Sequence, residues 1–80
     1  MRIDKYLKVS RIIKRRTMAN EACEKGRVML NDKPVKPGVE VRVGDVIEIA
    51  FGSGATRIKV TRVAEHVRKE EAGEMYELLP

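Results

Sequence analysis

The spacing of apolar residues changes once along this 80-residue chain, and the change falls next to Gly26. Before it, apolar side chains recur every three to four residues, which is the spacing of one face of an α-helix. From Arg27 onward they alternate with polar residues, which is typical of half-buried β-strands. The sequence therefore predicts an α+β fold in which a helical part precedes a sheet.

The first predicted helix carries Ile3, Tyr6 and Leu7 on one face, with the small Ser10 on the same line. A longer helix would place Ile12 among basic side chains. We therefore expect this helix to end between Ser10 and Ile12, and we expect Tyr6 to lie in the core.

The second predicted helix starts at Thr17, a suitable N-cap, and ends at Gly26, which can adopt the left-handed conformation that closes a helix. Four small or apolar residues form its expected buried stripe: Met18, Ala19, Ala22 and Cys23. Three polar residues are expected to face water: Asn20, Glu21 and Glu24.

Turn-forming residues divide the remaining chain into short strands. Asn31-Asp32, Pro37-Gly38 and Gly44-Asp45 are the predicted turns, and Gly52-Ser53-Gly54 is a predicted loop. The expected strands are 28–30, 33–35, 39–43, 47–51 and 57–63, with a helical turn at 68–72 and a sheet edge at 75–79. We predict two N-terminal helices packed on a small, mostly antiparallel sheet, and one domain over residues 1–80, since no linker or repeat divides the chain.

Positive charge is concentrated in the N-terminal part. Residues 1–36 hold 11 lysines and arginines against 4 acids, whereas residues 37–80 hold 6 against 8. A free helix N-terminus is already partly positive, so cations beside it oppose folding and suit a bound anion. Phosphate groups of a nucleic acid are the expected anion. The candidate RNA-binding residues are Arg2, Lys5, Lys8, Arg11, Lys14, Arg15 and Arg16.

Other interpretations of this charge remain open. A run of charges is often only a solvated face. Two helices with a turn between them also occur in helix-turn-helix proteins that bind DNA, although Glu21 and Glu24 on the second helix would repel a duplex. A protein adaptor is a third possibility. Contacts from the first helix and the bend favour folded RNA recognised through its phosphates.

The sequence offers little for catalysis. His66 is the single histidine, Cys23 falls on the expected buried stripe, and no group of residues has metal-ligand spacing. Gly52-Ser53-Gly54 is not followed by the Lys and Ser or Thr of a phosphate-binding loop. We therefore expect no enzyme activity, no catalytic residue, no metal and no cofactor.

The expected location is the cytoplasm. No apolar run approaches the roughly 20 residues needed to cross a bilayer, and the N-terminus is too polar for a signal peptide. A single cysteine cannot form an internal disulfide, which fits a reducing compartment. We expect no membrane partner and a monomer.

Four fragments in order resemble the ribosomal-protein-S-four-type (alpha-L) RNA-binding domain. They are Arg2-Ile3-Asp4-Lys5-Tyr6-Leu7, then Arg16-Thr17, then Gly26-Arg27-Val28-Met29-Leu30-Asn31, and then Val43-Gly44-Asp45-Val46-Ile47. Asp32 stands where the family more often has glycine. The sequence is most similar to the small stand-alone members that act in ribosome-associated quality control, and it lacks the long basic C-terminal extension of the related heat-shock proteins.

The resemblance implies a role on obstructed large ribosomal subunits that still hold a nascent chain on tRNA. Such a protein contacts large-subunit rRNA and peptidyl-tRNA together, while a partner factor directs addition of a C-terminal alanine tail. A general rRNA- or tRNA-binding accessory role, of the heat-shock or ribosome-assembly type, is the alternative. Arg2 and Arg16 match the family's RNA-contacting positions. Asp4 is expected to position a neighbouring base or to cap the first helix.

Overall fold

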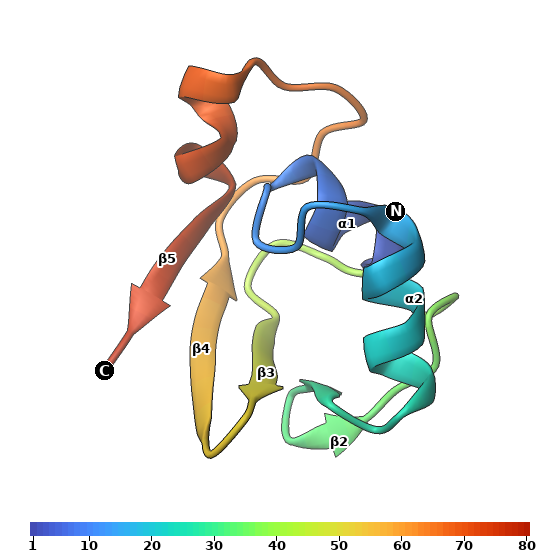
Figure 1. Ribbon diagram of the computed structural model, residues 1–80. Coiled ribbons are helices and arrows are strands. Elements are labelled where there is room, and N and C mark those ends of the chain that lie inside the picture. The colour runs from blue at the N-terminus through green and yellow to red at the C-terminus, as the bar shows by residue number, and fades with distance from the viewer.

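Two helices lie over a five-stranded antiparallel sheet in the computed structural model, which describes residues 1–80 (Figure 1). The elements are α1 (Ile3–Val9), α2 (Arg16–Glu24), β1 (Val28–Leu30), β2 (Lys33–Pro34), β3 (Val46–Phe51), β4 (Gly54–Val60), the 3-10 helix η1 (Lys69–Met75) and β5 (Tyr76–Leu79). The strand order is β2-β1-β3-β4-β5, and all neighbours are antiparallel. The predicted fold class is confirmed.

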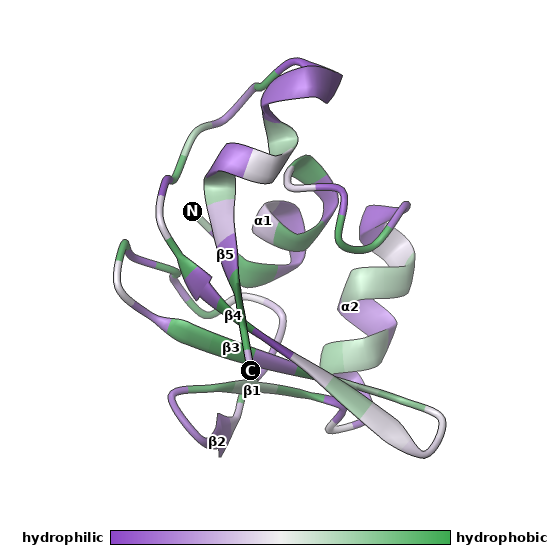
Figure 2. Ribbon diagram, turned by 90° about the vertical axis from the view of Figure 1, so that its left-hand side faces the viewer, coloured by the Kyte–Doolittle hydropathy of each residue, from purple (hydrophilic) through white to green (hydrophobic).

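The core lies between the helices and one face of the sheet. Figure 2 shows from the side how the helices lie over that face. Ile3, Tyr6 and Leu7 of α1 are fully buried, as predicted, against strand residues such as Ile47 and Ile58. Burying each large apolar side chain is worth about 1.5–3 kcal/mol. This packing fixes the orientation of α1, so its polar face is presented to solvent.

The segment 39–43 is not the predicted strand. Its alternating valines led to that prediction, but the chain here satisfies the N-terminus of α1 instead. The N–H of Ile3 donates to the Val39 carbonyl at 2.8 Å, and the Val41 N–H donates to the Met1 carbonyl at 2.8 Å. Only an isolated bridge joins Arg2 to Glu40. Backbone groups engaged with α1 cannot also extend the sheet.

The N-cap of helix α2 lies two residues earlier than predicted. Arg15, in extended conformation, is the N-cap, and no side chain caps the helix, so the prediction for Thr17 is wrong. Ala19 and Cys23 are buried as expected, whereas Met18 is 53% exposed. The buried stripe is narrower than predicted because α2 packs on α1 and β1 along one line of small residues.

Glycine and asparagine end α2 and shape the first hairpin as predicted. Gly26 has φ +73°, its N–H donates to the Cys23 carbonyl, and the next N–H donates to the Ala22 carbonyl. These two bonds make a Schellman motif. Asn31 and Asp32 have φ values of 50° and 69°, which is the backbone of a two-residue hairpin turn.

Strand β4 is displaced by three residues from the predicted strand 57–63. Strand β4 starts at Gly54 and ends at Val60, so only Gly52 and Ser53 form the turn where a three-residue loop was expected. Phe51 is 50% exposed although it shares a face with Ile47 and Ile49, because it lies at the tip of this hairpin.

The C-terminal segment returns along α1 before it joins the sheet. The carbonyl of Met75 accepts hydrogen bonds from the Tyr6 hydroxyl at 2.7 Å, the Thr61 N–H at 2.9 Å and the Arg62 N–H at 3.2 Å. This junction connects α1 to both ends of the segment 61–75, which lies beside α1 in Figure 1. The predicted helical turn is present but extends to Met75, and β5 forms the predicted sheet edge. No helix is long and apolar enough to cross a bilayer.

Candidate nucleic-acid interface

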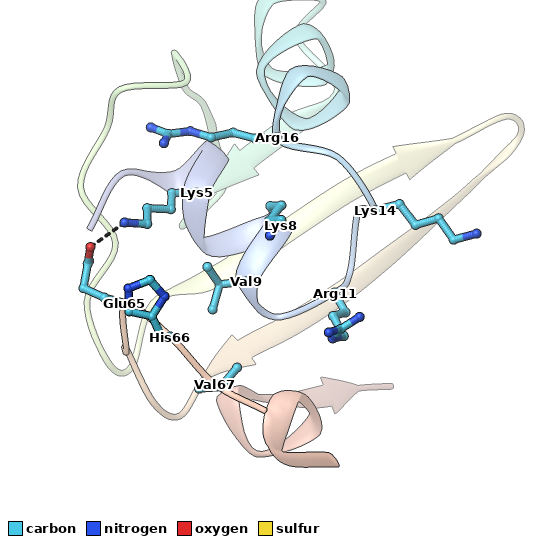
Figure 3. Close-up of a pocket in the computed structure, with 9 residues that line it drawn as sticks. All are labelled: Lys5, Lys8, Val9, Arg11, Lys14, Arg16, Glu65, His66 and Val67. Carbon is cyan, nitrogen blue, oxygen red and sulfur yellow. Dashed lines mark hydrogen bonds and ion pairs between the residues drawn. The ribbon is translucent and has the colours of Figure 1, made fainter. Parts of the chain in front are cut away.

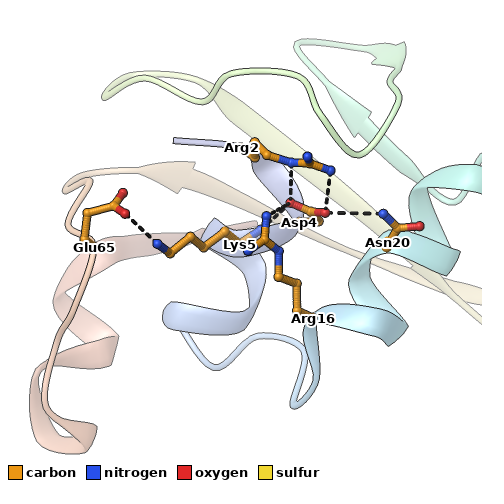
Figure 4. A network of polar contacts seen from close by, with 6 residues as sticks. All are labelled: Arg2, Asp4, Lys5, Arg16, Asn20 and Glu65. Atoms are coloured by element: carbon orange, nitrogen blue, oxygen red, sulfur yellow. Dashed lines mark hydrogen bonds and ion pairs between the residues drawn. The ribbon is translucent and has the colours of Figure 1, made fainter.

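A buried carboxylate organises the start of both helices. Asp4, only 2% exposed, accepts hydrogen bonds from Arg2 Nε at 3.2 Å and Arg2 Nη2 at 3.0 Å. On its other side Asn20 Nδ2 donates at 3.3 Å, and the Arg16 guanidinium lies 3.4 Å away (Figure 4). Residues from the N-terminus, α1 and α2 therefore converge on one acid.

The two arginines keep their outer surfaces free. The side chains of Arg2 and Arg16, called here the arginine pair, are 52% and 46% exposed. Each guanidinium uses one edge for Asp4 and leaves further N–H donors for a ligand, because arginine carries five. The carboxylate thus fixes both guanidinium groups side by side at the surface, and their remaining donors suit phosphate oxygens.

The ionisation of Asp4 follows from these partners. Burial alone would raise its pKa, but hydrogen bonds from Arg2 and Asn20 and the charges of Arg16 and Arg2 outweigh that effect. The pKa of Asp4 therefore lies below its ordinary value, and the group is ionised at neutral pH. Its N-terminal position on α1, where it also accepts the Lys5 N–H at 2.7 Å, favours the same charge.

A second feature is a recess of about 350 Å³ on the other side of Arg16, called here the basic recess (Figure 3). Nine residues line it: Lys5, Lys8, Val9, Arg11, Lys14, Arg16, Glu65, His66 and Val67. Five are cations, from α1, from the bend between the helices and from the start of α2. Arg16 also borders the neighbouring cleft over Asp4, so it joins the two parts of the surface.

Most of these cations have no internal partner. Lys8, Arg11 and Lys14 take part in no ion pair and are exposed, and the same is true of Arg15, which lies outside the recess at the N-cap of α2. A free cation beside others costs stability unless an external anion neutralises it, which is the property of a polyanion-binding surface. Lys5 differs, because its Nζ donates to the Glu65 carboxylate.

Six of the seven predicted binding residues line one of these two recesses. Arg15 lines neither and lies at the N-cap of α2. The expectation that Asp4 caps α1 is wrong, because Arg2 is the N-cap and no side chain caps the helix. The contacts of Asp4 to the arginine pair were not predicted. Asn20 was expected to face water and instead contacts Asp4. The sequence did contain a signal for this contact, because Asn20 follows Arg16 by four residues and so lies on the same face of α2.

Residues of the C-terminal part that were not among the predicted binding residues also border the basic recess. Glu65 and His66 lie opposite α1 in Figure 3. No local pattern marks these residues in the sequence, because the junction at Met75 is what places their segment there. Cys23 is 2% exposed and belongs to the core, as predicted. No three His, Cys, Asp or Glu residues are grouped so that they could hold a metal ion.

Two fragments that follow the helices, residues 26–31 and 43–47, contact each other through polar side chains and are called here the scaffold motifs. Asn31 accepts the Val46 N–H at 2.9 Å through its side-chain oxygen and donates to Asp45 at 3.1 Å. Asp45 in turn accepts the Arg42 N–H at 2.9 Å. These contacts join the first hairpin to the entrance of β3, so both motifs serve the fold and lie away from the basic recess.

The part of the chain that carries the buried acid and the arginine pair matches a known family. The model of the S4 domain matches residues 1–47, which include Asp4, the arginine pair and both scaffold motifs. The chain belongs to the S4 domain family.

Relatives of known name match almost the whole chain. A protein of Listeria innocua named "RQC P-site tRNA stabilizing factor" is 52% identical over 99% of this chain and 86% of its own length. A Bacillus subtilis protein of the same name is 42% identical over 99% of this chain and 92% of its own. Among solved structures, the trimeric Heat Shock Protein 15 of Vibrio cholerae is similar with a TM-score of 0.91 at 29% identity, over 99% of this chain and 81% of that one. The resemblance noted in the sequence is confirmed.

Proposed function

We propose that this protein is a non-catalytic RNA-binding factor of ribosome-associated quality control that stabilises tRNA in the P site. The names of its relatives, at up to 52% identity over nearly the full chain, support this assignment. The observation that carries it is the placement of the arginine pair. Asp4 holds both guanidinium groups half-exposed next to a recess lined by cations.

The arrangement suits folded RNA better than an extended single strand. The two aromatic side chains near the helices are unavailable for stacking, since Tyr6 is buried and Tyr76 is half-buried in β5. Recognition therefore relies on phosphates, whose positions are set by the RNA fold. If about four to six phosphates are bound, log affinity falls with log salt at a slope of roughly −3 to −5.

In finer detail, the two recesses offer two neighbouring contact areas that share Arg16. This geometry supports simultaneous binding of large-subunit rRNA and peptidyl-tRNA on an obstructed large subunit. The protein then retains the tRNA while an alanine-tailing factor extends the nascent chain. We place this activity in the cytoplasm, where ribosomes translate, and assign it to a monomer.

A general rRNA- or tRNA-binding role of the heat-shock type is the second candidate. The similarity to Heat Shock Protein 15 across 99% of this chain favours it. The two functions differ in their dependence on peptidyl-tRNA: a quality-control factor binds subunits carrying it more tightly than empty subunits. DNA binding through α2 fits poorly, because Glu21 and Glu24 are exposed on that helix.

The test is co-sedimentation with purified large subunits, with and without peptidyl-tRNA. The double variant R2A/R16A is expected to lose binding at least tenfold, since it removes the fixed guanidinium groups. The matched control is K59A, which removes an exposed, unpaired cation from the opposite face of the sheet. Equal binding of wild type and R2A/R16A, or no preference for subunits carrying peptidyl-tRNA, would overturn the proposal.

A further inference from the structure

One acid borders the basic recess, and it neutralises one of the cations there. Glu65 comes from the segment that follows β4, 60 residues after Lys5, and its carboxylate accepts a hydrogen bond from Lys5 Nζ (Figures 3 and 4). The hydrogen bond from Lys5, together with the charge of Lys5, lowers the pKa of Glu65 below its ordinary value, so the Glu65 carboxylate is ionised at neutral pH. Lys5 therefore differs from Lys8, Arg11 and Lys14, which have no counter-charge.

This pair differs from the contacts of Asp4 in exposure. Asp4 is 2% exposed and remains with the arginines, whereas the Glu65 side chain is 62% exposed and can turn into solvent. An exposed ion pair is weak, and another anion can replace one partner. While the pair is formed, Glu65 offsets the charge of Lys5 and uses one of its three N–H donors, so Lys5 attracts phosphate more strongly when Glu65 is displaced.

Displacement depends on how many contacts an RNA makes at once. An RNA already bound through Arg16, Lys8 and Arg11 presents its next phosphate to Lys5 at high effective concentration, and this phosphate competes well with the carboxylate. An RNA held by one or two contacts competes poorly, and Glu65 also repels its phosphates. A carboxylate at this place thus penalises incomplete contacts more than complete ones.

We propose that Glu65 is a specificity-determining residue, which withholds Lys5 from RNAs that do not match the whole basic recess. The inference rests on the proposed RNA-binding function and names the side chain that limits binding of other RNAs. It requires that removal of the Glu65 charge strengthens weak, generic binding more than binding to the matching RNA, and that this gain acts through Lys5.

The test compares two probes by fluorescence anisotropy, at several salt concentrations: a generic 20-base-pair RNA duplex and large subunits carrying peptidyl-tRNA. E65Q is expected to bind the duplex about three- to tenfold more tightly, with a salt slope steeper by about one, since one more phosphate is neutralised. Its affinity for the loaded subunits should change less than twofold. E70Q is the matched control, because Glu70 is exposed, unpaired and outside the basic recess.

A double-mutant cycle identifies the residue through which the gain acts. K5Q is expected to weaken duplex binding more in the E65Q background than in the wild type, so that K5Q/E65Q loses most of the gain of E65Q. Equal gains for E65Q and E70Q, or the same effect of K5Q with and without Glu65, would overturn the inference. Because the cycle is measured on duplex RNA, it does not depend on a preference for peptidyl-tRNA, whose absence would count against the proposed function alone.

Discussion

Asp4 and Arg16 lie on different helices, and their side chains meet with 3.4 Å between the carboxylate and the guanidinium. The acid is buried while the base is half-exposed, so the contact anchors Arg16 without covering it. Arg2 contacts the same carboxylate from the N-terminal side. A negative charge in the middle of a cationic surface therefore supports anion binding by positioning its neighbours.

Replacement of Asp4 by asparagine tests this positioning role through the sign of the effect. Loss of a negative charge near a phosphate-binding surface would by simple electrostatics raise affinity. If Asp4 positions the arginine pair, D4N instead lowers affinity for loaded large subunits about tenfold, and it destabilises the fold by about 1–3 kcal/mol. Anisotropy and urea denaturation measure the two effects.

D32N is the matched control for D4N, because Asp32 is an exposed acid in the hairpin turn. It makes the same change of charge and should alter affinity less than twofold. An affinity of D4N equal to or above that of the wild type would show that the arginines need no support from the carboxylate.

Acid sensitivity follows from the lowered pKa of Asp4. A carboxyl group with a depressed folded pKa contributes stability above its unfolded pKa, near 3.8, and loses this contribution as pH falls through the folded value. The difference in unfolding free energy between wild type and D4N should therefore be constant above about pH 5 and shrink below pH 4. Urea unfolding from pH 2.5 to 7 measures it. The effect is specific to Asp4, since Glu21 and Glu65, whose pKa values are lowered by Lys25 and Lys5, are present in both proteins. A difference that grows with acidity would contradict the assignment.

Sequence patterns among neighbouring residues were sufficient to predict most of the fold. The apolar face of α1, the glycine that ends α2 and the Asn31-Asp32 turn each involve residues within a few positions of one another. The segment 39–43 shows where such signals fail. Its valines alternate as in a strand, yet the Val39 carbonyl accepts the Ile3 N–H of α1 and the Val41 N–H donates to the Met1 carbonyl, and neither contact is visible in the segment itself.

The candidate site was predictable to the same degree. The cations of the basic recess were identifiable because they are close in sequence and excess charge is visible in composition. The roles of Asn20 and Glu65 were not, since each depends on how two distant elements pack. A helix crossing brings Asn20 to Asp4, and the junction at Met75 brings Glu65 to Lys5.

The environment of Cys23 predicts slow chemical modification. Burial, with smaller contributions from the charges of Asp4 and Glu24, raises the pKa of the thiol to about 11. Alkylation requires the thiolate, so iodoacetamide at pH 8 should label the native protein about 100-fold more slowly than the urea-unfolded protein. Mass spectrometry of timed samples measures the rates. Equal rates in the two states would show that α2 opens readily from the sheet.

Arg11 occupies a backbone position that disfavours arginine. It follows the last turn of α1 with φ 63°, a left-handed conformation that costs an L-residue roughly 1–2 kcal/mol and that glycine adopts freely. Its side chain is exposed and borders the basic recess without an ion-pair partner. Arg11 therefore combines a strained backbone with an unpaired charge at the basic recess, which is the combination expected of a residue that serves binding.

The variant R11G separates stability from binding at this position. Relief of the left-handed strain should raise the free energy of unfolding by about 0.5–1 kcal/mol, while the loss of one phosphate contact lowers affinity for loaded large subunits severalfold and reduces the salt slope by about one. R11A is the control: it loses the same charge but keeps the strain, so its affinity should fall equally and its stability should stay within about 0.5 kcal/mol of the wild type. Urea denaturation and anisotropy at several salt concentrations measure both quantities. A stabilised R11G that binds as tightly as the wild type would remove Arg11 from the RNA-binding surface and leave its strained backbone without a functional reason.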